Sequence, residues 1–149
     1  MGRWQTRTLR FREQLQRNAV ALISLFVAVW SLSYNTWRNE QSEFNRNQRQ
    51  ASFVLLIELG ELQELVFHAH YDQESDRSAN LRTGWALALT TRDLAMVLRS
   101  PVPETAETMF EAWERHSAHL GSDDDSFTAI RDSIQRVRDE TLALLKDLE

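Results

Sequence analysis

Four histidines are the side chains in this sequence with the clearest potential for chemistry. His68 and His70 fall late in one predicted helix, and His116 and His119 fall late in another. Glu64 precedes His68 by four residues, so the two share a helix face. Imidazole nitrogens and carboxylate oxygens on facing helices can bind a metal ion. Glu64, His68, His116 and His119 are therefore the candidate metal ligands.

The spacing of these residues weakens the metal interpretation. His68 and His70 are two positions apart, so on a helix they point in nearly opposite directions. The paired Glu-x-x-His motif of di-iron bundles is absent. An up-down bundle would also place the two histidine pairs at the same end but on diagonal helices. We therefore expect surface or hydrogen-bonded histidines, with no bound metal and no cofactor.

Two further groups have a structural and a functional interpretation. Trp85 and Trp113 lie among apolar positions at helical spacing, which is typical of a core and less often of a ligand pocket between helices. The acidic run Asp123–Asp125 follows Ser122 and resembles a capping box at the start of a helix. We expect a helix start there and not a cation site.

Motifs of the common enzyme classes are missing from the sequence. The four glycines are scattered singly, so there is no phosphate-binding loop, and no nucleophile elbow, HExxH or EF-hand loop occurs. The chain has no cysteine and hence no thiol nucleophile. Residues 38–149 hold 12 basic and 21 acidic residues, which disfavours nucleic-acid binding. We expect a protein that is not an enzyme.

An uncharged segment covers residues 18–37. A helix of this length spans about 30 Å, the thickness of the hydrocarbon core of a bilayer. Cations flank it on both sides, and aromatic rings that favour the headgroup region lie at one end. The predicted membrane-interface residues are Arg17, Trp30, Tyr34, Trp37 and Arg38.

The distribution of arginines predicts the orientation of this segment. Five precede it and three follow within about fifteen residues, so the positive-inside rule places residues 1–17 in the cytoplasm and the C-terminal domain in the periplasm. Sixteen of the seventeen basic residues are arginines, a usage typical of GC-rich bacterial genomes. We expect a single-pass protein of the bacterial inner membrane.

A cleaved signal peptide is the alternative to a retained anchor. The strictly apolar run Ala19–Leu32 is short enough for one, and Ser31 and Ser33 supply small residues before Tyr34. The bulky Trp30 and Leu32 argue against cleavage. Cleavage would leave a soluble periplasmic helical protein.

Residues 38–50 are polar except for Phe44 and contain neither Gly nor Pro. We expect the membrane helix to continue through them as a stalk, and the bundle domain to cover residues 51–149. A seven-residue recurrence along the membrane segment and stalk would form a coiled-coil seam with a partner helix. Its members are Ile23, Trp30, Trp37, Phe44 and Ala51.

Four amphipathic helices are predicted from residue 51 onward. Ala51–Tyr71 carries a stripe of Leu55, Leu59, Leu62, Val66 and Ala69, which Phe53, Val54, Leu56 and Ile57 widen. After the polar break Asp72–Ser78, residues 80–99 show Leu81, Trp85, Leu89 and Met96 on one side, extended by Leu94, Val97 and Leu98.

The third and fourth helices are bounded by characteristic residues. Pro103 suits the first turn of the third helix, and Gly121 suits its C-terminal cap. The last helix alternates apolar residues by three and four positions, at Phe127, Ile130, Ile134, Val137, Thr141, Leu144 and Leu148. The sequence thus predicts an all-α protein in which one transmembrane helix continues into a stalk and an up-down four-helix bundle.

Several short stretches resemble a group of short uncharacterised proteobacterial single-pass membrane proteins. They are Ser31–Glu40 (SLSYNTWRNE), Gly60–Gln63 (GELQ), His70–Asp72 (HYD) and Arg82–Trp85 (RTGW). The resemblance implies a bacterial envelope setting and brings no activity, cofactor or catalytic residue.

The anchor, the stalk and the acidic domain together suggest an interaction or accessory protein of the envelope. Its expected partners are the lipid bilayer and either another envelope protein or a second copy of the chain. The alternative is a sensor-like bundle that binds a small ligand between its helices and needs a partner for output; this rests on analogy of fold alone.

Overall fold

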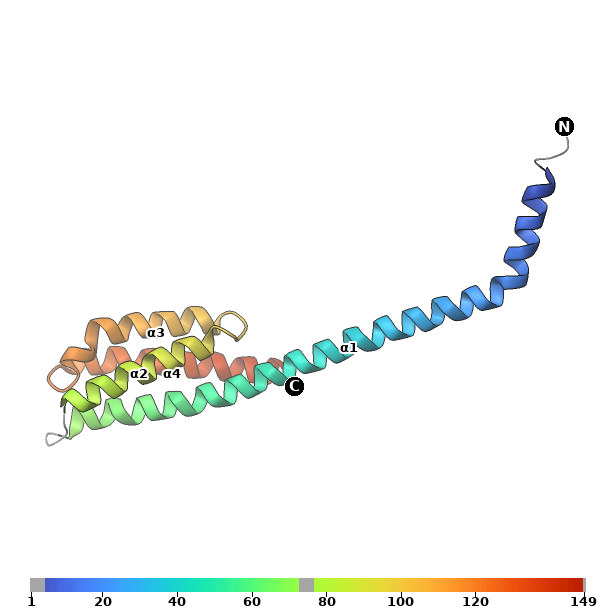
Figure 1. The fold of residues 1–149 in the computed structure, drawn as a ribbon. Coiled ribbons are helices and arrows are strands. Elements are labelled where there is room, and N and C mark those ends of the chain that lie inside the picture. The colour runs from blue at the N-terminus through green and yellow to red at the C-terminus, as the bar shows by residue number, and fades with distance from the viewer. Residues whose placement is uncertain (1–4, 73–76, 149) are drawn as a thin grey trace. The chain divides into compact units, whose positions relative to one another are not determined.

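The computed structural model describes the backbone of residues 5–72 and 77–148, and the side chains of residues 18–72 and 81–148. These residues form helices α1 (Gln5–Tyr71), α2 (Arg77–Ala95), α3 (Val102–His116) and α4 (Asp124–Asp147), with a short 3-10 helix η1 (Ser117–His119) before α4 (Figure 1). No strand occurs in these ranges, and the predicted all-α class is confirmed. The predicted break Asp72–Ser78 falls partly on residues 73–76, outside the described ranges.

The chain divides into two compact units, residues 1–43 and 44–149. Helix α1 contributes to both units, which confirms the prediction that one helix continues from the apolar segment into the bundle. The second unit covers residues 44–149, and Gln48, in the predicted stalk, is buried in it. The Gln48 side-chain amide donates to the carbonyl of Val97 at 2.8 Å, and its oxygen accepts from the backbone N–H of Arg99 at 3.0 Å.

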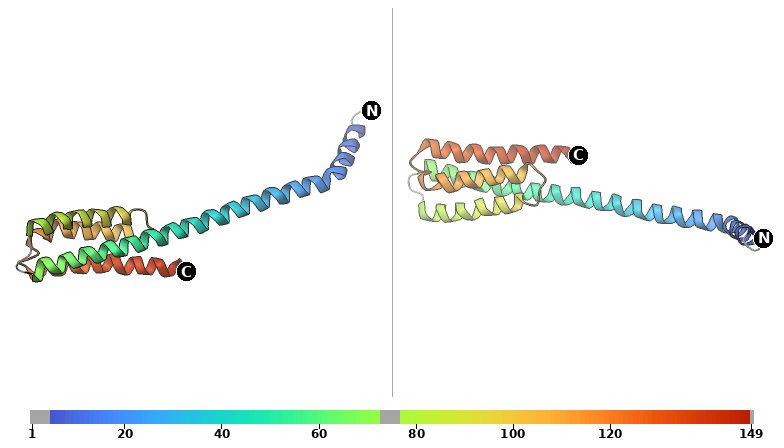
Figure 2. Two further views of the ribbon diagram at one scale, coloured as in Figure 1. Left: turned by 60° about the horizontal axis from the view of Figure 1, so that its bottom comes forward. Right: turned by 90° about the horizontal axis from the view of Figure 1, so that it is seen from above.

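In the second unit the C-terminal part of α1 lies beside α2 and α4, with α3 across the bundle from it, and successive helices run in opposite directions (Figures 1 and 2). Contacts at both ends fix this arrangement. At one end the Arg49 guanidinium donates to the carbonyl of Leu148, beyond the end of α4. At the other end the His70 ring contacts the carbonyl of Leu120 at 2.9 Å. The predicted up-down bundle is confirmed.

Helices α1 and α4 bury the stripes that the sequence predicts. Leu55, Leu59, Leu62 and Val66 of α1 are all buried. All seven predicted positions of the last helix, from Phe127 to Leu148, are buried as well. A regular three- and four-residue spacing keeps these side chains on one face of each helix, so they meet in a single core.

Helix α2 differs from its prediction because it turns small residues toward the core. Its most buried positions are Gly84, Ala88, Thr91 and Ala95, followed by Leu98 just beyond its end. The predicted core residues Leu89, Met96 and Val97 are exposed. Small side chains on this face of α2 leave room for large side chains from the neighbouring helix.

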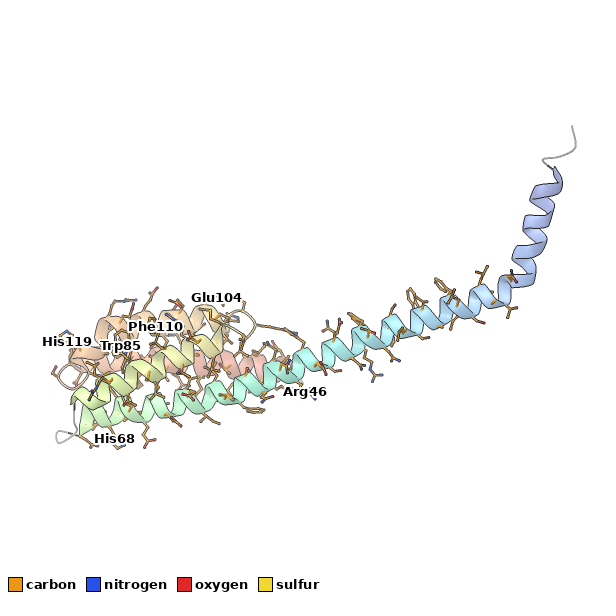
Figure 3. All side chains as sticks on the ribbon, in the orientation of Figure 1. Arg46, His68, Trp85, Glu104, Phe110 and His119 are labelled. Carbon is orange, nitrogen blue, oxygen red and sulfur yellow. The ribbon has the colours of Figure 1, made fainter. Side chains whose placement is uncertain are left out.

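The large partner is Trp113 of α3, which is almost completely buried. Its ring meets that of Trp85 edge to face, with centroids 6.5 Å apart, and Trp85 in turn meets Phe110 at 5.8 Å. Figure 3 shows Trp85 and Phe110 close together between α2 and α3. The interpretation of both tryptophans as packing residues is confirmed.

The connection between α3 and α4 corrects two predicted caps. Pro103 lies in the first turn of α3 as predicted, but α3 ends at His116, its C-cap Ser117 has a right-handed conformation, and the chain continues into η1. No described glycine has a positive φ, so Gly121 is not the left-handed cap. The N-cap of α4 is Asp123 and not Ser122: its carboxylate accepts from the Ser126 backbone N–H at 3.0 Å. The hydrogen bonds from the side chain and backbone of Ser126 hold the pKa of Asp123 below its ordinary value.

Three buried polar atoms have no hydrogen-bond partner among the described residues: Ser52 Oγ, Thr91 Oγ1 and Trp113 Nε1. A buried hydroxyl without a partner loses its bonds to water and gains nothing in return. Thr91→Val replaces that hydroxyl by a methyl group of similar size. We expect the variant to raise the free energy of unfolding by about 1 kcal/mol, measured by urea denaturation of the detergent-solubilised chain. An unchanged or lower value would show that the hydroxyl has a partner.

Candidate interaction surface

The side of α1 that faces away from the core carries exposed apolar residues. Phe53 and Ile57 are 57% and 61% exposed, and Val54 lies beside them at 39%. Single exposed apolar residues are ordinary on a protein surface, but a contiguous group on one helix face is typical of a contact surface. We name this group, continued along the helix by Gly60, Glu61 and Glu64, the α1 outer face.

Helix geometry explains why these residues cannot enter the core. Leu55 and Leu59 point into the bundle, and a residue two positions away on a helix is turned by about 200°. Phe53 and Ile57 are therefore directed outward. The prediction that Phe53, Val54 and Ile57 widen the core face of this helix is wrong, although Leu56 is partly buried and packs against the core.

The space over Gly60, next to Ile57, is not filled by any side chain of the bundle. A side-chain carbon built at Gly60 would meet no atom within 4 Å. Nothing within the bundle therefore requires a glycine at this position, although glycine costs about 1 kcal/mol relative to alanine inside a helix. A residue without a side chain lets another backbone approach α1 closely.

Three carboxylates lie along the same stretch of α1, at Glu58, Glu61 and Glu64. Glu64 lies 3.7 Å from the His68 ring. Within the part of the chain that the structure describes, Glu58 and Glu61 have no ion-pair partner. The α1 outer face thus combines apolar side chains, a gap at Gly60 and unpaired negative charge.

The histidines that the sequence singles out do not gather into one site. His68 is exposed and contacts Asp72 at 2.6 Å and Glu64 at 3.7 Å. His119 lies in η1, well separated from His68 in Figure 3. The His116 ring contacts Ser126 Oγ at 3.2 Å. Among the described residues no group of three His, Asp or Glu side chains is arranged to bind a metal ion.

His70 connects the end of α1 to the start of α4. One ring nitrogen contacts the Leu120 carbonyl at 2.9 Å, and the other lies 3.3 Å from the Asp124 carboxylate. The ring stacks on Phe127, with centroids 4.2 Å apart and planes inclined by 18°. The sequence indicates a hydrogen-bonded histidine but not these partners, because the contact depends on the connection between α3 and α4.

The carboxylate of Asp72, helped by Glu64, raises the pKa of His68 above its ordinary value. A raised pKa in the folded state means that the interaction stabilises the fold below the pKa of the unfolded chain, about 6.5. This contribution is lost as the pH rises through the higher folded value. We expect His68→Gln to lower the Tm at about pH 5 and to leave it unchanged at about pH 8. Thermal unfolding at both pH values measures the difference; an equal effect at both would contradict it.

The first unit contains an exposed apolar helix surface. Its helix is the one in the described part of the chain that is long and apolar enough to cross a membrane, and none of the apolar stretch is buried. Trp30, Tyr34, Trp37 and Arg38 are exposed; the side chain of Arg17 lies outside the described residues. A shallow hollow of about 240 Å³ on this surface is lined by Phe26, Val27 and Trp30, all apolar.

Comparison with known proteins gives no further assignment for this arrangement: no protein-family model, no curated protein and no solved structure matches the chain.

Proposed function

We propose that this protein is a membrane-anchored interaction protein that presents its helical bundle to a partner through the α1 outer face. The observation that carries the proposal is the group Phe53, Val54 and Ile57, exposed on a bundle whose core is otherwise closed by the opposite face of the same helix. A soluble domain gains nothing in stability from apolar side chains in water, whereas a contact surface does gain when it binds.

The anchor in this proposal is the apolar segment of α1. An exposed apolar helix surface of this length finds a favourable environment in a bilayer and an unfavourable one in water. Trp30, Tyr34 and Trp37 have the amphipathic rings that favour the headgroup region. A signal sequence near an N-terminus would share these properties, so retention in the membrane is part of the proposal.

The orientation in the proposal follows from the arginines. Five of them lie in residues 1–17, and the positive-inside rule favours the cytoplasm for that segment. The bundle then lies on the opposite side of the membrane, in the periplasm if the protein is bacterial. There it can reach other envelope proteins.

Site-specific photocrosslinking in living cells tests the proposal. A photoreactive amino acid at Ile57 is expected to give a discrete adduct of higher mass. The matched control is Leu142 of α4, an exposed apolar residue on another helix at 41% exposure. The proposal predicts an adduct at Ile57 that is absent at Leu142. No adduct at Ile57, or the same adducts at both positions, would contradict it.

A further inference from the structure

The α1 outer face has the repeat of a helix-packing seam. Phe53, Ile57, Gly60 and Glu64 of this face, continued beyond it by Phe67 and Tyr71, follow one another at alternating four- and three-residue steps. The stripe that packs into the bundle, Leu55 to Val66, has the same steps on the opposite side. A second helix can pack along a stripe with this spacing. Two helices that lie side by side contact each other through residues three and four positions apart.

The C-terminal end of this seam is already partly covered by α4. The rings of Phe67 and Tyr71 meet Phe127 of α4 edge to face, at 5.5 Å in each case. The open part of the seam therefore lies on the N-terminal side of Phe67 and is centred on Ile57 and Gly60. Because Gly60 has no side chain and nothing lies over it, a partner backbone can approach most closely there.

Charge selects among the helices that would fit this seam. Glu58 and Glu61 have no ion-pair partner in the described part of the chain, and Glu64 has only the His68 contact. A helix with lysines or arginines flanking its apolar stripe would pair with these carboxylates. A second copy anchored in the same membrane would run parallel and place the carboxylates of Glu61 and Glu64 against their own counterparts, which is unfavourable.

We propose that the α1 outer face binds a basic amphipathic helix of a partner protein, with apolar side chains over Phe53 and Ile57, its backbone closest at Gly60, and its cations opposite Glu58, Glu61 and Glu64. This inference rests on the proposed function and specifies the chemistry of the partner.

A pair of synthetic helices provides the probe. Each carries leucines at the a and d positions of a heptad repeat over about three heptads. One has lysines at the flanking positions and the other has glutamates. Fluorescence anisotropy measures their binding to the full chain in nanodiscs of zwitterionic lipid, after binding to empty nanodiscs is subtracted. The lysine helix is expected to bind more tightly than the glutamate helix by about tenfold or more.

Substitutions in the chain locate the binding. Ile57→Ser and Gly60→Leu are expected to weaken binding of the lysine helix by about tenfold or more. Both positions are open to solvent or to empty space, so the fold should tolerate the changes. Leu142→Ser, the control on α4, should leave binding unchanged. The double substitution E61K/E64K should reverse the preference, so that the glutamate helix binds more tightly.

Three results would overturn the inference. They are equal binding of the two helices, binding that is insensitive to Ile57→Ser, and a dimer of the chain in sedimentation that Ile57→Ser dissociates. The last result would identify a second copy as the occupant. If the Ile57 crosslink forms in cells while the lysine helix fails to bind, the interaction function stands and the basic helix is wrong. If the crosslink also fails, both are wrong.

Discussion

Replacing Gly84 by alanine should lower the free energy of unfolding of the bundle by about 1–3 kcal/mol. A side-chain carbon at Gly84 would lie 2.3 Å from Cη2 and Cζ2 of Trp113 and 3.2 Å from Cδ2 of Leu65. The indole ring is rigid and only 1% exposed, so it has no free space into which to move. This overpacking outweighs the gain of about 1 kcal/mol that alanine normally brings to a helix.

Urea denaturation followed by circular dichroism measures this effect. Gly60→Ala is the matched control, because it is a glycine in a helix of the same bundle with nothing within 4 Å of the new carbon. It should raise the free energy of unfolding by about 0.5–1 kcal/mol. If Gly84→Ala proved as stable as Gly60→Ala, the close packing of α2 against Trp113 would be refuted.

With the apolar segment as the proposed membrane anchor, introducing an arginine at Val27 should remove most of the chain from the membrane. Val27 lies in the middle of the uncharged segment 18–37 and is exposed. A charge at the centre of a transmembrane helix disfavours insertion by about 3 kcal/mol, equivalent to about a hundredfold change in the insertion equilibrium. Carbonate extraction of membranes, followed by immunoblotting, measures the retained fraction.

Asn35→Arg is the control for this substitution. Asn35 lies near the end of the segment between Tyr34 and Trp37, where a long cationic side chain can extend into the headgroup region. Retention of this variant should match that of the unmodified chain. If Val27→Arg were retained equally well, the apolar segment would not be what holds the protein in the membrane.

The comparison of α4 with α2 shows what periodicity can predict. Helix α4 has seven residues at regular three- and four-residue spacing on one face, while Leu142 on its outer side is an exception, so its core face could be predicted position by position. Helix α2 has its large apolar residues on both sides of its core face, where Leu81, Trp85, Leu87 and Leu94 are partly buried. The most buried positions between them are Gly84, Ala88, Thr91 and Ala95. Small residues contribute little to the pattern of large apolar side chains, so periodicity does not single out this face. The side of α2 that packs is the one on which Gly84 leaves room for Trp113 of the neighbouring helix.

The α1 outer face was predictable in part. Phe53 and Ile57 stand out in the sequence as apolar residues next to the core stripe, and the natural interpretation is a wider core face. Phe53 is two positions from Leu55, and Ile57 is two positions from both Leu55 and Leu59, so the spacing already gives an angle of about 200° and indicates the outward direction. The open space at Gly60 could not be predicted, because it depends on which neighbours approach α1 in three dimensions.

For the histidines and the start of α4, too, part of the structure follows from the sequence and part depends on the path of the backbone. The opposite directions of His68 and His70 follow from their spacing, and the contacts with Asp72 and Leu120 agree with it. The N-cap at Asp123 in place of Ser122 is a shift by one residue within a run of good capping residues. Sequence preferences do not distinguish such neighbours; the path of the backbone after η1 does.

The proposal that the protein is membrane-anchored and presents its bundle outside the cytoplasm is tested most directly by fusing topology reporters to the C-terminus. Alkaline phosphatase is active only outside the cytoplasm. The second reporter is a fluorescent protein that fluoresces only inside the cytoplasm. We expect phosphatase activity without fluorescence, in the membrane fraction and at the full mass of the fusion. Fluorescence without phosphatase activity would contradict the orientation, and an active, soluble product shortened at Ser33 would contradict the anchor.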